Sequence, residues 1–127
     1  MNSSSMKDLI DRYLAAYNAF DVDGMLSLLS QDVRFENYSG NQLTAATSGI
    51  DEFRNLAEQS RSLFSEREQR IAGLEFGHDS AIAVIAYRGK LAADIPDGPS
   101  ASTVLDLQGE SEFSFGNGQI TRIVDRS

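Results

Sequence analysis

The sequence predicts an α+β fold in which a strongly curved, mainly antiparallel sheet wraps around N-terminal helices and encloses a pocket. Apolar residues at helical spacing fill most of the first half of the chain, and long strand-like segments separated by turn residues fill the second half. Helices and strands segregated in this way are typical of α+β domains. The length of 127 residues suits a single core, so we expect residues 1–127 to form one domain.

Two helices are predicted at the start of the chain. Apolar residues recur at helical spacing from Leu9 to Phe20, and Ser5 is placed to cap the beginning of this helix. Residues 21–24 interrupt the pattern, and a short helix is expected over residues 25–29. Residues 21–24 faintly resemble a calcium-binding loop, but no ligand series follows them, so we interpret their aspartates as helix caps.

A short strand, a loop and a third helix come next. Residues 33–37 alternate apolar and polar side chains, which predicts a strand, and the polar stretch 38–48 predicts a loop. The third helix is expected to begin near Ser48 or Gly49. Its buried side is predicted to comprise Ile50, Phe53, Leu56, Ala57, Leu63 and Phe64.

The second half of the chain predicts four strands, at about residues 65–76, 80–91, 103–115 and 119–125. Residues 77–79 and 116–118 are predicted hairpin turns, and residues 96–99 anchor a longer connection. Gly109 lies inside the third of these strands, where glycine often marks a bulge or bend. A bulge there would change which side chains of the strand face inward.

Composition limits the function. The net charge is −8 and the basic residues are scattered, which argues against nucleic acid as a partner. The absence of cysteine excludes disulfides and thiolate sites and fits a cytoplasmic location. The beginning of the chain does not resemble a secretory signal, and no apolar run is long enough for a membrane span. His78, the only histidine, is expected in an exposed turn, so no metal is expected.

Residues 12–37 and 109–127, with the order of elements between them, resemble the nuclear transport factor 2-like superfamily. The resemblance is strongest to its SnoaL-like (polyketide cyclase-like) branch, which is related in fold to ketosteroid isomerase. It implies a cystatin-like cone, cofactor-independent chemistry and a homodimer formed through the sheet. The superfamily includes isomerases, epoxide hydrolases, cyclases, dehydratases and binding domains, so the resemblance does not fix the activity.

Ketosteroid isomerases resemble residues 12–40 without a gap. Tyr13 corresponds to their hydrogen-bonding tyrosine, which stabilises an enolate. Asn37 stands where those enzymes carry their basic aspartate, and an amide cannot abstract a proton. The second oxyanion donor of the family falls near Ser111. The catalytic set of a steroid isomerase is therefore incomplete.

Limonene epoxide hydrolases activate a water with an Asp-Arg-Asp arrangement beside a tyrosine and an asparagine. Asn37 resembles their asparagine, and Phe35 stands in place of the tyrosine. The strand that should carry Arg-x-Asp corresponds to residues 83–88, which lack that pattern. The epoxide hydrolase set is incomplete as well.

SnoaL-type cyclases use one acidic residue in an apolar cavity, without a metal or cofactor. A buried carboxyl suits this role because burial raises its pKa toward neutrality. On the corresponding late strand, the candidate catalytic residues are Asp106, Glu110 and Glu112.

The resemblance and the aromatic pattern together predict a pocket for a hydrophobic small molecule. The candidate lining residues are Tyr13, Tyr17, Phe35, Asn37, Phe53 and Tyr87. If Asn37 is buried, its amide must either bind the ligand or hydrogen-bond a neighbour. Three functions stay open: a cofactor-independent isomerase, cyclase or hydratase, a non-catalytic binding domain, and a protein-interaction module.

Overall fold

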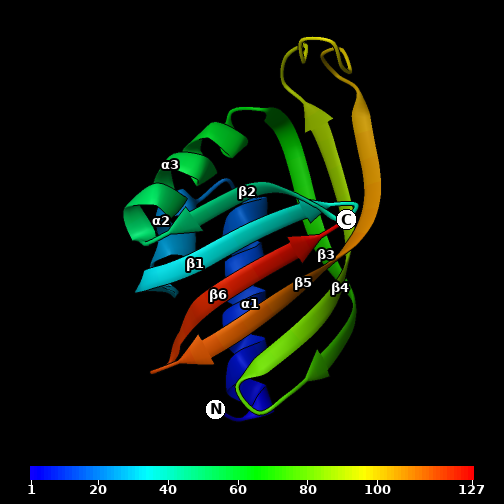
Figure 1. Cartoon of the computed structure of the whole chain (residues 1–127). Coiled ribbons are helices and arrows are strands. Elements are labelled where there is room, and N and C mark those ends of the chain that lie inside the picture. Colours follow the sequence, from blue (N-terminus) through cyan, green and yellow to red (C-terminus); the bar gives the residue numbers. More distant parts are fainter.

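The computed structural model describes all 127 residues and contains three helices and one six-stranded sheet (Figure 1). The predicted α+β class is confirmed. The elements in chain order are α1 (Ser3–Asn18), α2 (Val22–Leu26), β1 (Leu29–Ser39), β2 (Gln42–Ser48), α3 (Ile50–Arg61), β3 (Phe64–Phe76), β4 (Ser80–Leu91), β5 (Val104–Gly116) and β6 (Gln119–Arg126).

The sheet has the strand order β2-β1-β6-β5-β4-β3. All neighbouring strands are antiparallel except β1 and β6, which run parallel. The sheet curls, with α1 lying behind it and α3 covering one end (Figure 1). Because β1 and β6 are adjacent, side chains from the first and last strands of the chain come together on one face of the sheet.

Helix α1 begins one turn earlier than the sequence predicts. The Asn2 side chain caps it by accepting a hydrogen bond from the Ser5 backbone nitrogen at 2.8 Å. Ser5 therefore lies inside the first turn, and its predicted role as the cap is wrong. The buried side of the helix follows the predicted apolar stripe, with Met6, Leu9, Ile10, Tyr13 and Leu14 packed in the core.

The end of α1 is joined to the edge strand β3. The Asn18 side-chain amide donates to the Gln69 carbonyl at 3.1 Å, and its oxygen accepts from the Gln69 nitrogen at 2.7 Å. These bonds satisfy backbone groups that an edge strand would otherwise leave open. They hold the last turn of α1 against the concave face of the sheet.

Helix α2 confirms the capping interpretation for Asp21 but not for Asp23, whose carboxylate accepts from Arg54 Nη1 at 2.8 Å. The helix covers residues 22–26 rather than the predicted 25–29, because Leu29 already begins β1. The Asp21 carboxylate accepts a hydrogen bond from the Gly24 backbone nitrogen at 2.9 Å. This is the contact expected of an N-cap aspartate, which satisfies a free donor in the first turn. The break between α1 and α2 therefore has a structural explanation.

Strand β2 was not predicted, because residues 38–48 read as a loop. The structure continues β1 to Ser39, turns at Gly40 with a φ of 62°, and returns along β2. This strand lies at the sheet edge and is mostly exposed, so it needs no apolar alternation. The small and polar residues of this segment do not predict a strand. Pairing with β1 stabilises it as one.

The end of α3 also differs from the prediction. Phe53 and Ala57 are buried as expected, but the helix ends at Arg61. Leu63 is exposed after the helix, and Phe64 begins β3. Leu63 and Phe64 follow the end of α3 at a spacing that continues its apolar pattern. The pattern therefore predicted a longer helix than the structure contains.

The four long strands confirm the predictions to within two residues at each end. The bulge predicted at Gly109 is wrong, because the pairing of β4 with β5 runs without a shift past Ile85 and Gly109. A Cβ at position 109 would lie 2.5 Å from the backbone oxygen of Arg126. Close approach of the β6 backbone therefore accounts for the glycine.

A core of 20 buried residues fills the space between the helices and the concave face. It includes the inward side chains of β5 and β6, among them Phe113, Phe115, Ile120 and Ile123. None of the three helices has the length and apolarity needed to cross a membrane. The core occupies one end of the concave face, and a cavity occupies the other.

Candidate functional site

The cavity has a volume of about 360 Å³ and lies between the concave face of the sheet, α1 and α3. This volume is within the usual range for small-molecule sites. All six residues predicted to line a pocket line this cavity: Tyr13, Tyr17, Phe35, Asn37, Phe53 and Tyr87. Their role toward a ligand stays a prediction.

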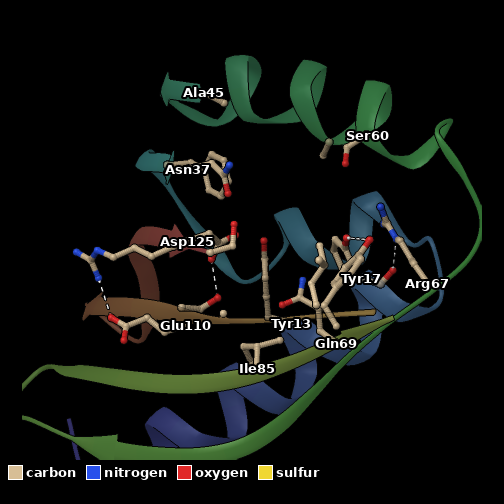
Figure 2. Close-up of a pocket in the computed structure, with 18 of the residues that line it drawn as sticks. Tyr13, Tyr17, Asn37, Ala45, Ser60, Arg67, Gln69, Ile85, Glu110 and Asp125 are labelled. Atoms are coloured by element: carbon tan, nitrogen blue, oxygen red, sulfur yellow. Dashed lines mark hydrogen bonds and ion pairs between the residues drawn. The ribbon is translucent and has the colours of Figure 1, made fainter. Parts of the chain in front are cut away.

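A row of polar side chains crosses three strands at one end of the cavity (Figure 2). Asn37 on β1 pairs with Asp125 on β6, and Asp125 pairs with Ser111 on β5. Residues paired across neighbouring strands point to the same face of a sheet. The Ser111 hydroxyl donates a hydrogen bond to Asp125 Oδ1 at 2.6 Å. The strand order therefore gathers an amide, a carboxyl and a hydroxyl at one wall.

Asp125 is the carboxyl whose pKa this arrangement raises. Burial raises its pKa from 3.8 to about 6, while the hydrogen bond from Ser111 acts in the opposite direction. A carboxyl with a pKa near neutrality can both accept and return a proton under physiological conditions. Asp125 thus has the chemistry of a general base or acid.

Tyr13 reaches the cavity from α1. Its side chain is only 5% exposed, and its ring packs edge-on against Phe113 with the centroids 6.0 Å apart. Burial raises the pKa of its hydroxyl, and the charge of Asp125 raises it further. The hydroxyl therefore stays protonated at neutral pH, as a hydrogen-bond donor must.

The Asn37 side chain has a protein partner. Its amide nitrogen donates to Thr44 Oγ1 at 2.7 Å, and the same hydroxyl donates to the Asn37 carbonyl at 3.1 Å. The structure contains the predicted neighbour contact, and binding of a ligand by Asn37 stays a prediction. The contact with β2 orients the amide beside Asp125.

The other end of the cavity is aromatic and basic. Tyr17 donates a hydrogen bond to the Tyr87 hydroxyl at 3.1 Å. Arg67 Nε donates to the Tyr17 carbonyl at 2.9 Å. The Arg67 guanidinium also lies 3.7 Å from the centroid of the Tyr17 ring and 4.6 Å from that of Phe20, which are cation–π distances.

The three carboxylates selected from the sequence occupy other positions. Asp106, Glu110 and Glu112 alternate with Ser111 and belong to the opposite face of β5. Arg126 Nη1 donates to Glu110 Oε2 and to Glu112 Oε1, both at 3.1 Å. Glu110 lies at the cavity rim, and Asp106 is exposed. None of the three is enclosed as Asp125 is.

Sequence reasoning missed Asp125. Its spacing of two from Ile123 is the one sequence signal that placed it on the buried face. That signal was ambiguous because Ile123 and Val124 are both apolar, and both are buried. Only the pairing of β6 with β1 and β5 shows which face carries the cavity.

Metal-ligating side chains do not come together anywhere in the chain as a group of three or more. The His78 side chain is 97% exposed in the β3–β4 turn, as predicted. The residues available for chemistry in the cavity are therefore carboxyl, hydroxyl, amide and guanidinium groups.

The fold agrees with comparisons to known proteins. A family model described as the SnoaL-like domain matches residues 10–123, which is most of the chain. The chain belongs to the SnoaL-like domain family. This membership confirms the resemblance drawn from residues 12–37 and 109–127. A search of curated proteins gave no significant match.

Solved structures similar to this SnoaL-like protein share its whole fold. A proposed polyketide cyclase from Xanthomonas campestris pv. campestris is 21% identical, with a TM-score of 0.85 over 100% of this chain and 93% of its own. One from Silicibacter sp. is 25% identical, with a TM-score of 0.75 over 98% and 90%. A Catenulispora acidiphila protein with a ketosteroid isomerase-like fold, in complex with trimethylamine, is 12% identical, with a TM-score of 0.77 over 92% and 82%. These likenesses support the cone fold.

Proposed function

We propose that this SnoaL-like protein is a cofactor-independent acid–base enzyme acting on a hydrophobic, ring-containing ketone. Its common step is removal of a proton from the carbon next to the carbonyl, which forms an enolate. The enolate then regains a proton at another carbon, as in an isomerase, or attacks a second carbonyl, as in a cyclase. The observation that carries this proposal is the enclosed carboxyl of Asp125, with its pKa of about 6, at the cavity wall.

Asp125 is the proposed base. In ketosteroid isomerases, which resemble residues 12–40, the base corresponds to Asn37, which has no useful basicity. Asp125 is the direct neighbour of Asn37 on the adjacent parallel strand and faces the same cavity. A carboxylate one strand away therefore replaces the missing base, with the amide beside it.

Tyr13 is the proposed hydrogen-bond donor to the enolate oxygen. Its hydroxyl is protonated at neutral pH because burial raises its pKa. A fixed donor in a poorly hydrated site stabilises negative charge more strongly than water does. Tyr13 and Asp125 line the same cavity, which supports their acting on one substrate.

The lining of the cavity supports a hydrophobic substrate. Phe35 and Phe53 pack edge-on with their centroids 5.6 Å apart, and both rings line the cavity with Leu56 and Ile85. Apolar walls with a few convergent polar groups are typical of sites for small organic ligands.

The test is exchange of the α-hydrogens of 1-tetralone and 1-indanone in D2O, followed by proton NMR. The wild-type protein should accelerate exchange. Asp125→Asn should lower the rate at least about 100-fold, because it removes the proton acceptor. Tyr13→Phe should lower the rate less, because solvent and the remaining dipoles still stabilise the enolate in part.

Glu112→Gln is the matched control, since it removes a carboxylate from the opposite face of the sheet. It should exchange at the wild-type rate. If Asp125→Asn is folded and keeps the wild-type rate, the proposed base is wrong. If the wild-type protein binds these ketones without accelerating exchange, a non-catalytic binding domain becomes the better description.

A further inference from the structure

Arg67 on β3 is a buried cation without an ionic partner. Its side chain is only 6% exposed, yet it takes part in none of the ion pairs of the molecule. Burying an unpaired charge is costly, so buried arginines normally face a carboxylate or another anion. Glu66 and Glu68, its neighbours along β3, are exposed and belong to the other face of the strand.

The guanidinium is held in a fixed orientation. Its Nε donates to the Tyr17 carbonyl at 2.9 Å, and its central carbon Cζ lies over the rings of Tyr17 and Phe20. These contacts leave both terminal nitrogens, Nη1 and Nη2, without a protein hydrogen-bond acceptor, and Arg67 lines the cavity. An immobilised pair of donors of this kind matches the two oxygens of a carboxylate.

Arg67 and Asp125 lie at opposite ends of the cavity, with Tyr13 and Tyr17 between them (Figure 2). The row that contains Asp125 and Ser111 meets β4 at Ala83, whereas Arg67 pairs with Gly89. The two rows are therefore six positions apart along β4, which corresponds to at most about 20 Å of strand. One ligand of several fused rings or a short chain can span this interval.

We propose that the ligand of this cavity is a hydrophobic carboxylic acid whose carboxylate binds Arg67. The placement of its reacting carbon at Asp125 rests on the function proposed above, whereas carboxylate binding by Arg67 does not. Tyr17 and Tyr87, joined through their hydroxyls, form the aromatic wall beside the acidic group. Arg67 is thus a specificity residue that selects acids over neutral molecules of the same shape.

The test compares 2-naphthoate with methyl 2-naphthoate, a neutral molecule with the same ring system. The chain contains no tryptophan, so naphthalene fluorescence can be followed with little protein background. At pH 7.5 the wild-type protein should bind the acid at least about tenfold more tightly than the ester, because charge-assisted hydrogen bonds form only with the carboxylate. Arg67→Gln should abolish this preference by weakening binding of the acid much more than binding of the ester.

Arg70→Gln is the matched control, since Arg70 is an exposed arginine on the outward side of the same strand. It should keep the wild-type preference. Equal binding of acid and ester by the wild-type protein overturns the proposal. So does a folded Arg67→Gln variant that keeps the preference, or one that weakens acid and ester alike, since Arg67 would then serve only to hold α1 and its aromatic neighbours.

The two proposals can fail separately. Asp125→Asn should retain the preference for the acid, because the carboxylate binds at the other end of the cavity. Loss of the acid preference with intact ketone exchange would remove only the role of Arg67. Absence of exchange with an intact acid preference would remove only the role of Asp125.

Discussion

The surroundings of Asp125 raise the pKa of its carboxyl. An aspartate in water has a pKa of about 3.9 and is fully ionised at neutrality. On the concave face of β6, burial raises this pKa to about 6, and the Ser111 hydroxyl limits the rise by stabilising the charged form. On the outer face of β5, by contrast, Glu112 and Glu110 both accept hydrogen bonds from Arg126.

This pKa predicts how stability depends on pH. Because the pKa is higher in the folded than in the unfolded chain, the folded state binds the extra proton between about pH 4 and 6. The stabilisation from Asp125 is therefore present at low pH and is lost as the pH rises through about 6. Relative to Asp125→Asn, the free energy of unfolding of the wild-type protein should fall by up to about 3 kcal/mol over this range.

Urea denaturation of both proteins at intervals from pH 4 to 7.5 measures this difference. The variant is the reference for the wild-type protein. Because only position 125 differs, the contributions of all other titrating groups cancel in the difference between the two. Parallel stability curves for the two proteins would show that Asp125 titrates as an ordinary, solvated aspartate.

At the scale of elements, the junction of β5 with β6 sets the geometry of the candidate site. The two strands approach so closely at Gly109 that a side chain there would collide with the Arg126 backbone. Arg126 directly follows Asp125, so this approach also sets the position of the proposed base. Gly73 on β3 offers a contrast, because a Cβ there would lie 3.7 Å from the Val84 side chain, an ordinary contact.

Gly109→Ala should therefore destabilise the protein by about 1–3 kcal/mol, the usual range for overpacking. Gly73→Ala should be neutral or slightly stabilising, because it restricts the unfolded chain without a clash. Thermal unfolding of the two variants measures the difference. Equal stability of both would mean that the end of β6 shifts freely, and that Gly109 is not required for the close approach.

At the scale of the whole molecule, the outer face of the sheet is the surface predicted to form a homodimer. Ile82 and Val84 project from β4 on this face, with 38% and 37% of their surface exposed. Glu112 and Glu110 lie beside them on β5. A two-fold symmetric interface would cover the apolar residues of both copies with one self-complementary contact.

Sedimentation equilibrium should give the mass of a dimer at high micromolar concentration. Ile82→Glu should shift the protein toward the monomer, because it places a charge at the centre of the predicted interface. Leu63→Glu is the control, since Leu63 is also an exposed aliphatic residue but lies in the α3–β3 connection. A monomeric wild-type protein at the same concentration would contradict the predicted dimer.

Much of the architecture follows from local patterns in the sequence. The buried stripe of α1, the hairpin turns and the four long strands could be predicted because periodicity and turn chemistry act over a few residues. Strand β2 could not, since an exposed edge strand requires no apolar pattern. Tyr13 and the aromatic lining could be placed through the helical spacing of α1 and the family resemblance.

The sequence by itself therefore determined the curved sheet, its helices and the aromatic character of the cavity. Only the tertiary structure decided which charged groups the cavity contains. Asp125 lies beside Asn37 and Ser111 because their three strands pair in one register. Arg67 is buried because α1 ends against β3. Pairing register and desolvation are long-range properties, so local patterns are not sufficient to distinguish these two residues from the exposed charges around them.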